Sequence, residues 1–321
     1  MCGWRISCRL PFVLLTIALA LSGCDRSSPT THSASQPQPR ILRVSQRNEP
    51  GDLDGARATL PDEFALLRAL SEGLLVPGPV GAPPQPGAAR SYDVSPDGRT
   101  YTFHLRPEGK WSNGEPLTAA DFVAAYQRAL APATASTKAH VFFAVQGAKA
   151  FASGESRDFA TVGFRATDAL TLVITLATPT PNFPRVVASG PWLPTFPRAT
   201  PPALRNPATW VGNGPFVLAD WKPHQHLIVR RNPRWHGAAQ VALDEIRFVH
   251  LDDGDAEERA YRAGQIDATM AVPTAKIAPY AKERPSELHR AAMIETRYLA
   301  FNITHPPLDR PEVRRALALA I

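Results

Sequence analysis

The sequence predicts a mixed α/β fold, because stretches with strand periodicity alternate along it with stretches of helical periodicity. Apolar and polar residues alternate over 101–105 and 170–176, as expected for strands with one buried face. Apolar residues recur at helical spacing over 64–74. A strand-like segment and a helix-like one follow each other over 246–263 in the second half of the chain. Strands and helices are therefore interleaved rather than segregated, which is typical of α/β proteins.

The composition is that of a globular protein without a nucleic-acid partner. Of 321 residues, 44% are hydrophobic and 20% are charged, so the chain can bury a core. The 33 prolines favour many turns over long helices. The formal net charge is +6, but the basic residues are scattered, with no run beyond pairs such as Arg230-Arg231. We therefore expect no nucleic-acid binding.

The first 23 residues are predicted to be a lipoprotein signal peptide. Arg5 and Arg9 form a short basic region, and the apolar run over 10–21 is too short to cross a bilayer. The sequence Leu-Ser-Gly-Cys that ends at Cys24 resembles the bacterial lipobox, in which the cysteine is acylated and becomes the mature N-terminus. The alternative is an uncleaved anchor or core helix with an incidental cysteine.

The residues around this cysteine predict where the protein resides. All three cysteines lie within the first 24 residues, so the rest of the chain can form no disulfide. Residues 24–40 are rich in Ser, Thr, Pro and Gln and are predicted to be a flexible tether. Asp25 resembles an inner-membrane retention signal. We expect an exported, periplasmic protein that a lipid holds on a membrane, with the inner membrane favoured.

The first half of the body is predicted from local signals. Ile41–Val44 is a short strand, and Pro61 begins a helix. The Pro- and Gly-rich stretch over 76–89 connects two units. Ser95–Gly98 is the turn of a hairpin, and Thr118 caps a helix together with Asp121.

The second half continues the pattern. Strands are predicted at 227–229 and 246–248, and a helix over 255–263. Gly264–Asp267 is expected to end this helix and return the chain into a strand. A further strand is expected to begin at Leu299–Phe301. Residues 311–321 predict an amphipathic helix that has no C-terminal capping signal, so we expect the chain to be cut within an element.

No pattern of catalytic or metal chemistry stands out. His224 and His226 alternate as two solvent-facing residues of a strand would, and they are not expected to bind a metal. Residues 252–255 lack the spacing and the distal glutamate of a calcium loop, and are expected to form a turn and a helix cap. There is no nucleophile elbow and no phosphate-binding glycine loop. We expect no enzyme activity, no cofactor and no metal.

Several motifs in order resemble the family 5 extracellular solute-binding proteins, which are the oligopeptide- and dipeptide-binding receptors of ABC transporters. The strongest stretch covers 101–123, with the segments Tyr101–Arg106 and Lys110–Pro116. The remaining matches are Ala129–Ser136, Ser71–Leu75, Asn213–Phe216, Arg231–Trp235, Gly264–Asp267, Tyr298–Asn302 and Pro311–Leu317.

This resemblance implies a periplasmic-binding-protein-like α/β fold of class II with an inserted extra domain. Lobe I is expected to comprise 41–75 and 187–291, and the inserted domain II to comprise 76–186. Residues 292–321 would be the hinge and the truncated start of lobe III, most of which is missing.

The resemblance also implies how a ligand is held. Family members bind an extended peptide between lobes I and III, largely through backbone groups. Thr59, Leu60 and Pro61 occupy the ligand-facing stretch of lobe I, and Lys138 aligns with a tyrosine of the inserted domain. Thr59 replaces a carboxylate of some oligopeptide binders, and a lysine at 138 favours an anionic group over an aromatic one.

The function implied is capture of oligopeptides or dipeptides for delivery to a membrane permease. The partners are then a peptide or other small solute, the ABC permease subunits and, through the lipid, a membrane, with the protein itself a monomer. Two alternatives stay open. One is an inactive truncated lipoprotein of the same family, and the other is a binder of a non-peptide solute such as a nickel chelate or a sugar.

Overall fold

The computed structural model describes residues 38–51, 53–291 and 298–320. The predicted signal peptide, the lipidation site Cys24, Asp25 and most of the tether lie outside the described residues. Most of the predicted hinge lies outside them too. The elements discussed below belong to the unit formed by residues 39–321.

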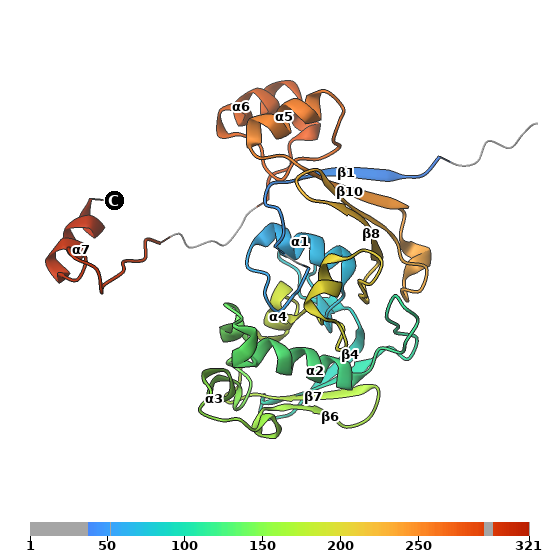
Figure 1. The fold of residues 1–321 in the computed structure, drawn as a ribbon, viewed down its shortest axis with the longest axis vertical. Coiled ribbons are helices and arrows are strands. Elements are labelled where there is room, and N and C mark those ends of the chain that lie inside the picture. Colours follow the sequence, from blue (N-terminus) through green and yellow to red (C-terminus); the bar gives the residue numbers. More distant parts are fainter. Residues whose placement is uncertain (1–37, 52, 292–297, 321) are drawn as a thin grey trace, which may run out of the picture. The chain divides into compact units, whose positions relative to one another are not determined.

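The described elements interleave helices and strands, as the sequence predicts (Figure 1). In chain order they are β1 (Ile41–Gln46), α1 (Pro61–Leu70), β2 (Leu75–Val76), β3 (Gln85–Pro86), β4 (Ala89–Val94), β5 (Thr100–Leu105), α2 (Ala119–Leu130), α3 (Ala148–Ser153), β6 (Phe164–Ala166), β7 (Thr171–Thr175), α4 (Phe183–Val187), β8 (Phe216–Lys222), β9 (His226–Arg231), β10 (Glu245–His250), α5 (Gly254–Arg262), α6 (Thr274–Glu283) and α7 (Pro311–Leu319).

The first sheet places the first strand beside three strands from the second half of the chain, in the order β1-β10-β9-β8. β1 runs parallel to β10, with Val44 opposite Phe248, whereas β10, β9 and β8 are antiparallel to their neighbours. Helix α1 packs against β8 and buries Leu66 and Leu70 completely. The helix forms because Pro61 presets the first helical position and its apolar residues fall on one face.

A third parallel segment borders the first sheet on the other side of β1. Ala268 bridges to Val44 in parallel orientation, and the Ser45 N–H donates to the Ala268 carbonyl at 3.2 Å. The chain therefore runs from β10 through α5 to a position beyond β1, as in a βαβ crossover. The expected return into a strand near Asp267 is thus a short bridge rather than a full strand.

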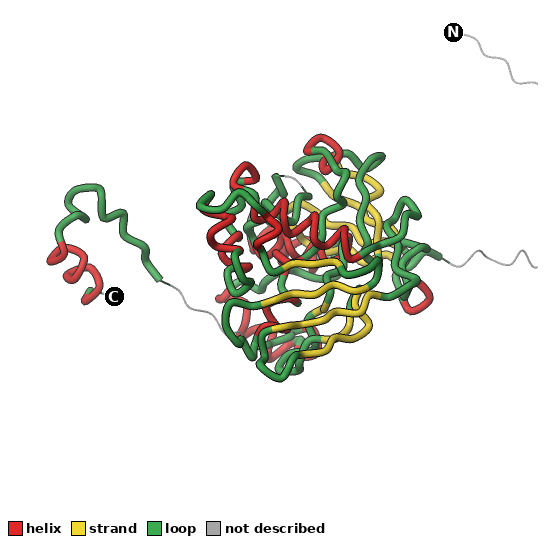
Figure 2. The backbone as a smooth tube through the Cα atoms, turned by 90° about the horizontal axis from the view of Figure 1, so that it is seen from below, coloured by secondary structure: helices red, strands yellow, loops and turns green. Residues whose placement is uncertain are grey.

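The second sheet is antiparallel throughout, in the order β4-β5-β7-β6. Figure 2 shows the strands in yellow and the helices in red. The predicted hairpin over β4 and β5 is confirmed, and α2 packs on β6 and β7. The predicted cap of α2 is confirmed as well, because the Asp121 N–H donates to Thr118 Oγ1 at 3.3 Å and the Thr118 N–H donates to Asp121 Oδ2 at 2.8 Å.

An aromatic core packs against the second sheet and α2. Trp192 is fully buried, and its ring centroid lies 5.0 Å from Tyr126, 4.5 Å from Phe142 and 5.5 Å from Phe183. The Tyr126 hydroxyl donates to the Trp192 carbonyl at 3.3 Å. Side chains that are far apart in sequence thus make one packed cluster, which holds the sheet and α2 together.

Two sequence expectations are wrong. Residues 299–301 form no strand, because the described residues offer them no neighbouring strand, and ladder hydrogen bonds stabilise extended segments. Tyr298 and Leu299 are 81% and 66% exposed. His224 is not a strand residue, since it lies in the turn between β8 and β9 with φ of +58°. The division of the body into lobes at 75, 186 and 291 stays a prediction.

Candidate functional site

Three parallel segments end at the same edge of the first sheet. β1, β10 and the segment at Ala268 all run in one direction, so the loops that leave their carboxyl ends meet there. These loops are residues 47–60, the start of α5 and residues 269–273. In open α/β sheets, ligands bind outside the carboxyl ends of the strands. This edge is therefore the candidate site.

Side-chain contacts fix the loop that leaves β1. Arg47 Nε donates to Glu257 Oε1 of α5 at 2.5 Å, and the Glu257 side chain is fully buried. Asp62 Oδ2 accepts from the Asn48 N–H at 3.1 Å and from Asn48 Nδ2 at 2.7 Å. The first two residues of the loop are thus tied to α5 and to the start of α1.

The predicted ligand-facing residues lie at the end of this loop, where α1 begins. Thr59, Leu60 and Pro61 are exposed. Glu63 Oε2 accepts both the Thr59 N–H at 2.8 Å and the Leu60 N–H at 2.9 Å, and the Leu60 carbonyl accepts from Phe64 N–H at 3.2 Å. Because Pro61 has no N–H, the stretch has no free backbone donor. It can offer a ligand the Thr59 carbonyl and the Leu60 side chain.

Lys138 lies in the segment after α2, just before the short helix η2 (Ala139–Phe142). Its carbonyl accepts from the Val141 N–H at 3.0 Å, and its own N–H donates to Ser136 Oγ at 3.3 Å. The side chain is half-buried. Within the described residues, no hydrogen bond or ion pair joins Lys138 to Thr59–Pro61, so the four predicted residues are not brought together by direct contact.

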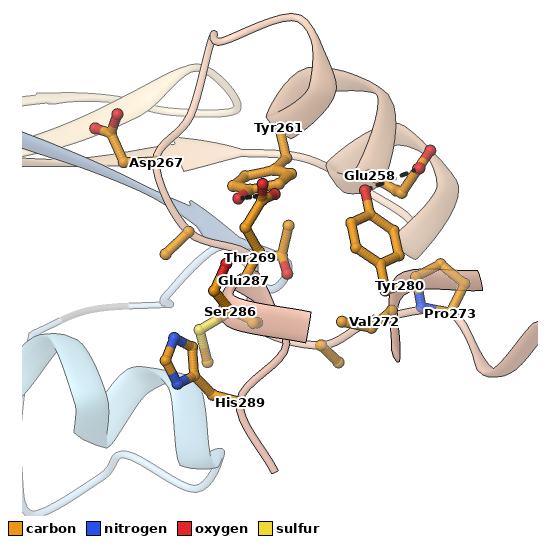
Figure 3. Close-up of a pocket in the computed structure, with 13 residues that line it drawn as sticks. Glu258, Tyr261, Asp267, Thr269, Val272, Pro273, Tyr280, Ser286, Glu287 and His289 are labelled. Atoms are coloured by element: carbon orange, nitrogen blue, oxygen red, sulfur yellow. Dashed lines mark hydrogen bonds between the residues drawn. The ribbon is translucent and has the colours of Figure 1, made fainter. Parts of the chain in front are cut away.

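A pocket of about 440 Å³ lies at the carboxyl edge, between α5, α6 and the helix η7 (Pro285–Glu287). Figure 3 shows Tyr261 beside Glu287 and Tyr280 pointing toward Glu258. The volume is within the range of small-molecule sites. The pocket is lined by Glu258, Tyr261, Asp267, Ala268, Thr269, Met270, Ala271, Val272, Pro273, Tyr280, Ser286, Glu287 and His289.

Two tyrosine–glutamate pairs hold the walls of this pocket. The Tyr261 hydroxyl donates to Glu287 Oε2 at 2.7 Å, and the Tyr280 hydroxyl donates to Glu258 Oε1 at 3.1 Å. The hydrogen bond from Tyr261 lowers the pKa of Glu287, and the same bond raises the pKa of Tyr261. Burial raises the pKa of Tyr280. Near neutral pH, both phenols are therefore protonated donors, and Glu287 is ionised.

Most residues of this pocket could not be assigned to a site from the sequence. Its walls come from residues 258–289, and among its lining residues only Asp267 belongs to a motif that resembles the family. One signal was available, because Thr269 and Met270 directly follow a predicted strand return, and residues after parallel strands often face ligands. The Met270 N–H donates to Ser45 Oγ at 2.9 Å, which fixes this segment beside β1.

Two features are absent from the described part of the chain. No group of three or more His, Cys, Asp or Glu residues there could hold a metal ion. His226 Nε2 instead pairs with Asp220 Oδ2 at 2.9 Å, and Asp253 caps α5 by accepting from the Ala256 N–H at 2.7 Å. None of the described helices has the length and hydrophobicity to cross a bilayer.

Comparisons with known proteins show which proteins this chain is similar to. A family model described as bacterial extracellular solute-binding proteins, family 5 Middle, matches residues 83–321. The "probable deoxycholate-binding periplasmic protein YgiS" of Escherichia coli (strain K12) is 33% identical over 321 residues, covering 96% of this chain and 57% of that protein. The periplasmic oligopeptide-binding protein OppA of the same organism is 32% identical over 266 residues, covering 81% and 48%.

Solved structures give the same result. The Escherichia coli murein tripeptide binding protein MppA aligns with a TM-score of 0.81 at 30% identity, covering 88% of this chain and 56% of that one. The mixed α/β fold is thus that of the periplasmic oligopeptide-binding proteins, as the sequence predicts. The chain spans about half the length of the relatives and of the structure it matches.

Proposed function

The chain belongs to the bacterial extracellular solute-binding proteins, family 5, and from that premise we propose that it captures a peptide for delivery to an ABC permease. One observation carries the proposal most. Two features lie at the carboxyl edge of the same parallel strands. They are the predicted ligand-facing stretch at Thr59–Pro61 and the pocket formed by residues 258–289. A ligand at this edge would contact both.

The names of the relatives support a peptide as the ligand. OppA is named for oligopeptides and MppA for a murein tripeptide. An extended peptide offers N–H groups to the Thr59 carbonyl and side chains to the pocket. In a longer protein of this family, lobe III would close over the ligand. By bridging the two lobes, the ligand would shift the population toward the closed state. We propose no catalytic activity.

One relative favours a different solute. YgiS is named for deoxycholate, an amphipathic anion with a rigid apolar skeleton. The exposed Leu60 side chain and Met270, which is 47% exposed, are apolar surfaces that such a skeleton could cover. Binding of a non-peptide solute is therefore the second candidate function. The third possibility is that the chain binds solutes of neither class.

We further propose export and lipid anchoring through Cys24. The basic residues, the short apolar run and the lipobox-like Leu-Ser-Gly-Cys support this proposal. Asp25 favours the inner membrane. The permease subunits would be the protein partners of a monomeric receptor, and lobe I (41–75 with 187–291), domain II (76–186) and the start of lobe III (292–321) would be its parts.

Isothermal titration calorimetry of the purified chain with tri-alanine and with deoxycholate tests the proposal. We expect saturable binding of tri-alanine and weaker or no binding of deoxycholate. Tighter binding of deoxycholate would assign the chain to the second candidate. Heat from neither ligand, with the protein folded by circular dichroism, would overturn solute capture by this chain.

A further inference from the structure

We propose that the pocket between α5, α6 and η7 binds a positively charged group of the ligand, a primary amine or a guanidinium. This assigns to the pocket a preference that nothing in the family comparison gives it. The inference rests on the proposed function in one respect, because it takes the captured solute to be the source of the charged group.

The lining of the pocket is acidic. Glu258, Asp267 and Glu287 carry carboxylates, and none of the thirteen lining residues is a lysine or an arginine. His289 is the one lining side chain that can become positively charged, and it is exposed. An anionic ligand group would therefore meet repulsion in the pocket, whereas a cation would meet attraction.

Two phenol rings give the pocket a second means of attracting a cation. Tyr261 and Tyr280 both line the cavity, and a cation over the face of such a ring is stabilised by the ring quadrupole. Their hydroxyls donate to Glu287 and Glu258 at 2.7 and 3.1 Å, which fixes the orientation of each ring. Each carboxylate can accept further hydrogen bonds from a ligand ammonium or guanidinium.

Arginines outside the pocket now balance these carboxylates, but two of the three are weakly held. Arg284 lies 3.3 Å from Glu287 and Arg262 lies 3.7 Å from Glu258, and their side chains are 48% and 60% exposed. Glu287 and Glu258 themselves are 34% and 9% exposed, but the guanidinium ends of both pairs are solvated, and such pairs contribute little. A ligand cation inside the pocket can take their place.

Asp267 is different from the other two acids. Arg43 Nη2 donates to its Oδ1 at 2.7 Å and Arg43 Nε donates to its Oδ2 at 3.0 Å, so both oxygens are occupied. Asp267 therefore orients the segment at the pocket floor, and Glu258 and Glu287 are the residues that would contact the charged group. The hydrogen bond from Tyr261 lowers the pKa of Glu287, so this carboxylate is charged near neutral pH.

The test compares two peptides that differ by one charge. Both peptides are N-acetylated, so that the lysine side chain is the only primary amine. Calorimetry of the full chain with acetyl-Ala-Lys-Ala and with its norleucine isostere is expected to give at least tenfold tighter binding of the lysine peptide. Glu287→Gln is expected to reduce that ratio to about threefold or less. Glu283→Gln, an exposed residue of α6 that does not line this pocket, is the matched control and should leave the ratio unchanged.

A second probe separates this inference from the proposed function. Butylamine and butanol need no second lobe, and their binding is followed by the amide NMR shifts of residues 268–272. If butylamine shifts these amides, butanol does not, and neither peptide binds, the cation preference of the pocket is supported and peptide capture is refuted. Equal binding of the two peptides within twofold refutes the cation preference and leaves peptide capture standing. No shift with butylamine, or equal shifts with butanol, also overturns the inference.

Discussion

Arg128 of α2 binds Asp54 through both terminal nitrogens of its guanidinium. Asp54 lies in the loop that precedes α1. Arg128 Nη1 lies 2.6 Å from Asp54 Oδ1, and Nη2 contacts Oδ2. The Asp54 side chain is 2% exposed and that of Arg128 is 30% exposed. Asp54 Oδ1 also accepts from the Ala56 N–H at 3.1 Å. The pair ties the loop that leads to Thr59–Pro61 to the helix that covers the second sheet.

Asp54→Asn is expected to destabilise the protein by about 2–4 kcal/mol, because it removes the charge of a buried carboxylate that binds the Arg128 guanidinium. The free energy of unfolding in urea, followed by circular dichroism, measures the effect. Asp93→Asn is the matched control, since Asp93 is 80% exposed where it pairs with His104. A loss at Asp54 no larger than that at Asp93 would contradict this role.

Much of the fold could be predicted because its signals are local. The turn at Ser95–Gly98 and the cap formed by Thr118 and Asp121 are each encoded within four residues, and both are found as predicted. The aromatic cluster at Trp192 could not be predicted, since its neighbours come from separate segments. The strand expected at 299–301 failed for a related reason, because a strand depends on a partner as well as on its own sequence.

Only part of the candidate site could be predicted from the sequence. The exposed stretch at Thr59–Pro61 follows from the resemblance, but its bonds to Glu63 do not. The pocket depends on contacts such as Tyr261 to Glu287 and Tyr280 to Glu258, which join α5 to the helices that follow it. Only the packing of those helices brings these residues together.

Glu63→Ala is expected to free the N–H groups of Thr59 and Leu60 and to destabilise the protein by about 1 kcal/mol, as for the loss of a helix cap. Hydrogen exchange at both amides should accelerate, and urea unfolding gives the energy. Glu63→Gln keeps an acceptor oxygen and should show a smaller acceleration. Unchanged exchange at Thr59 and Leu60 in Glu63→Ala would refute the assigned bonds.

Acid should weaken the contact between Asp267 and Arg43. The pKa of Asp267 is lowered in the folded protein, first by the side-chain hydrogen bond from Arg43. Its stabilising contribution is therefore present above the ordinary Asp value of about 3.9 and is lost as the pH falls through the lower folded-state value.

The stability difference between the wild type and Asp267→Asn measures this effect. Urea unfolding at a series of pH values should give the largest difference near pH 6 and a shrinking one below about pH 4. A difference that stays constant down to pH 2.5 would mean that Asp267 contributes nothing through its charge.

Cys24→Ser is expected to abolish lipid attachment, because serine lacks the thiol that forms the bond to the lipid. Expression in a bacterium fed with labelled palmitate should give a labelled membrane-bound wild type and an unlabelled variant that sheds into the periplasmic fraction. Cys8→Ser is the control and should stay labelled. Equal labelling of all three proteins would disprove Cys24 as the anchor.

The most direct test of peptide capture at the carboxyl edge is photo-crosslinking of the chain with a tripeptide that carries a benzophenone side chain, followed by peptide mapping. We expect adducts within residues 59–61 and 268–273 that excess tri-alanine suppresses. Adducts that tri-alanine does not suppress, or that map to the outer face of β4–β7, would contradict peptide capture at this edge.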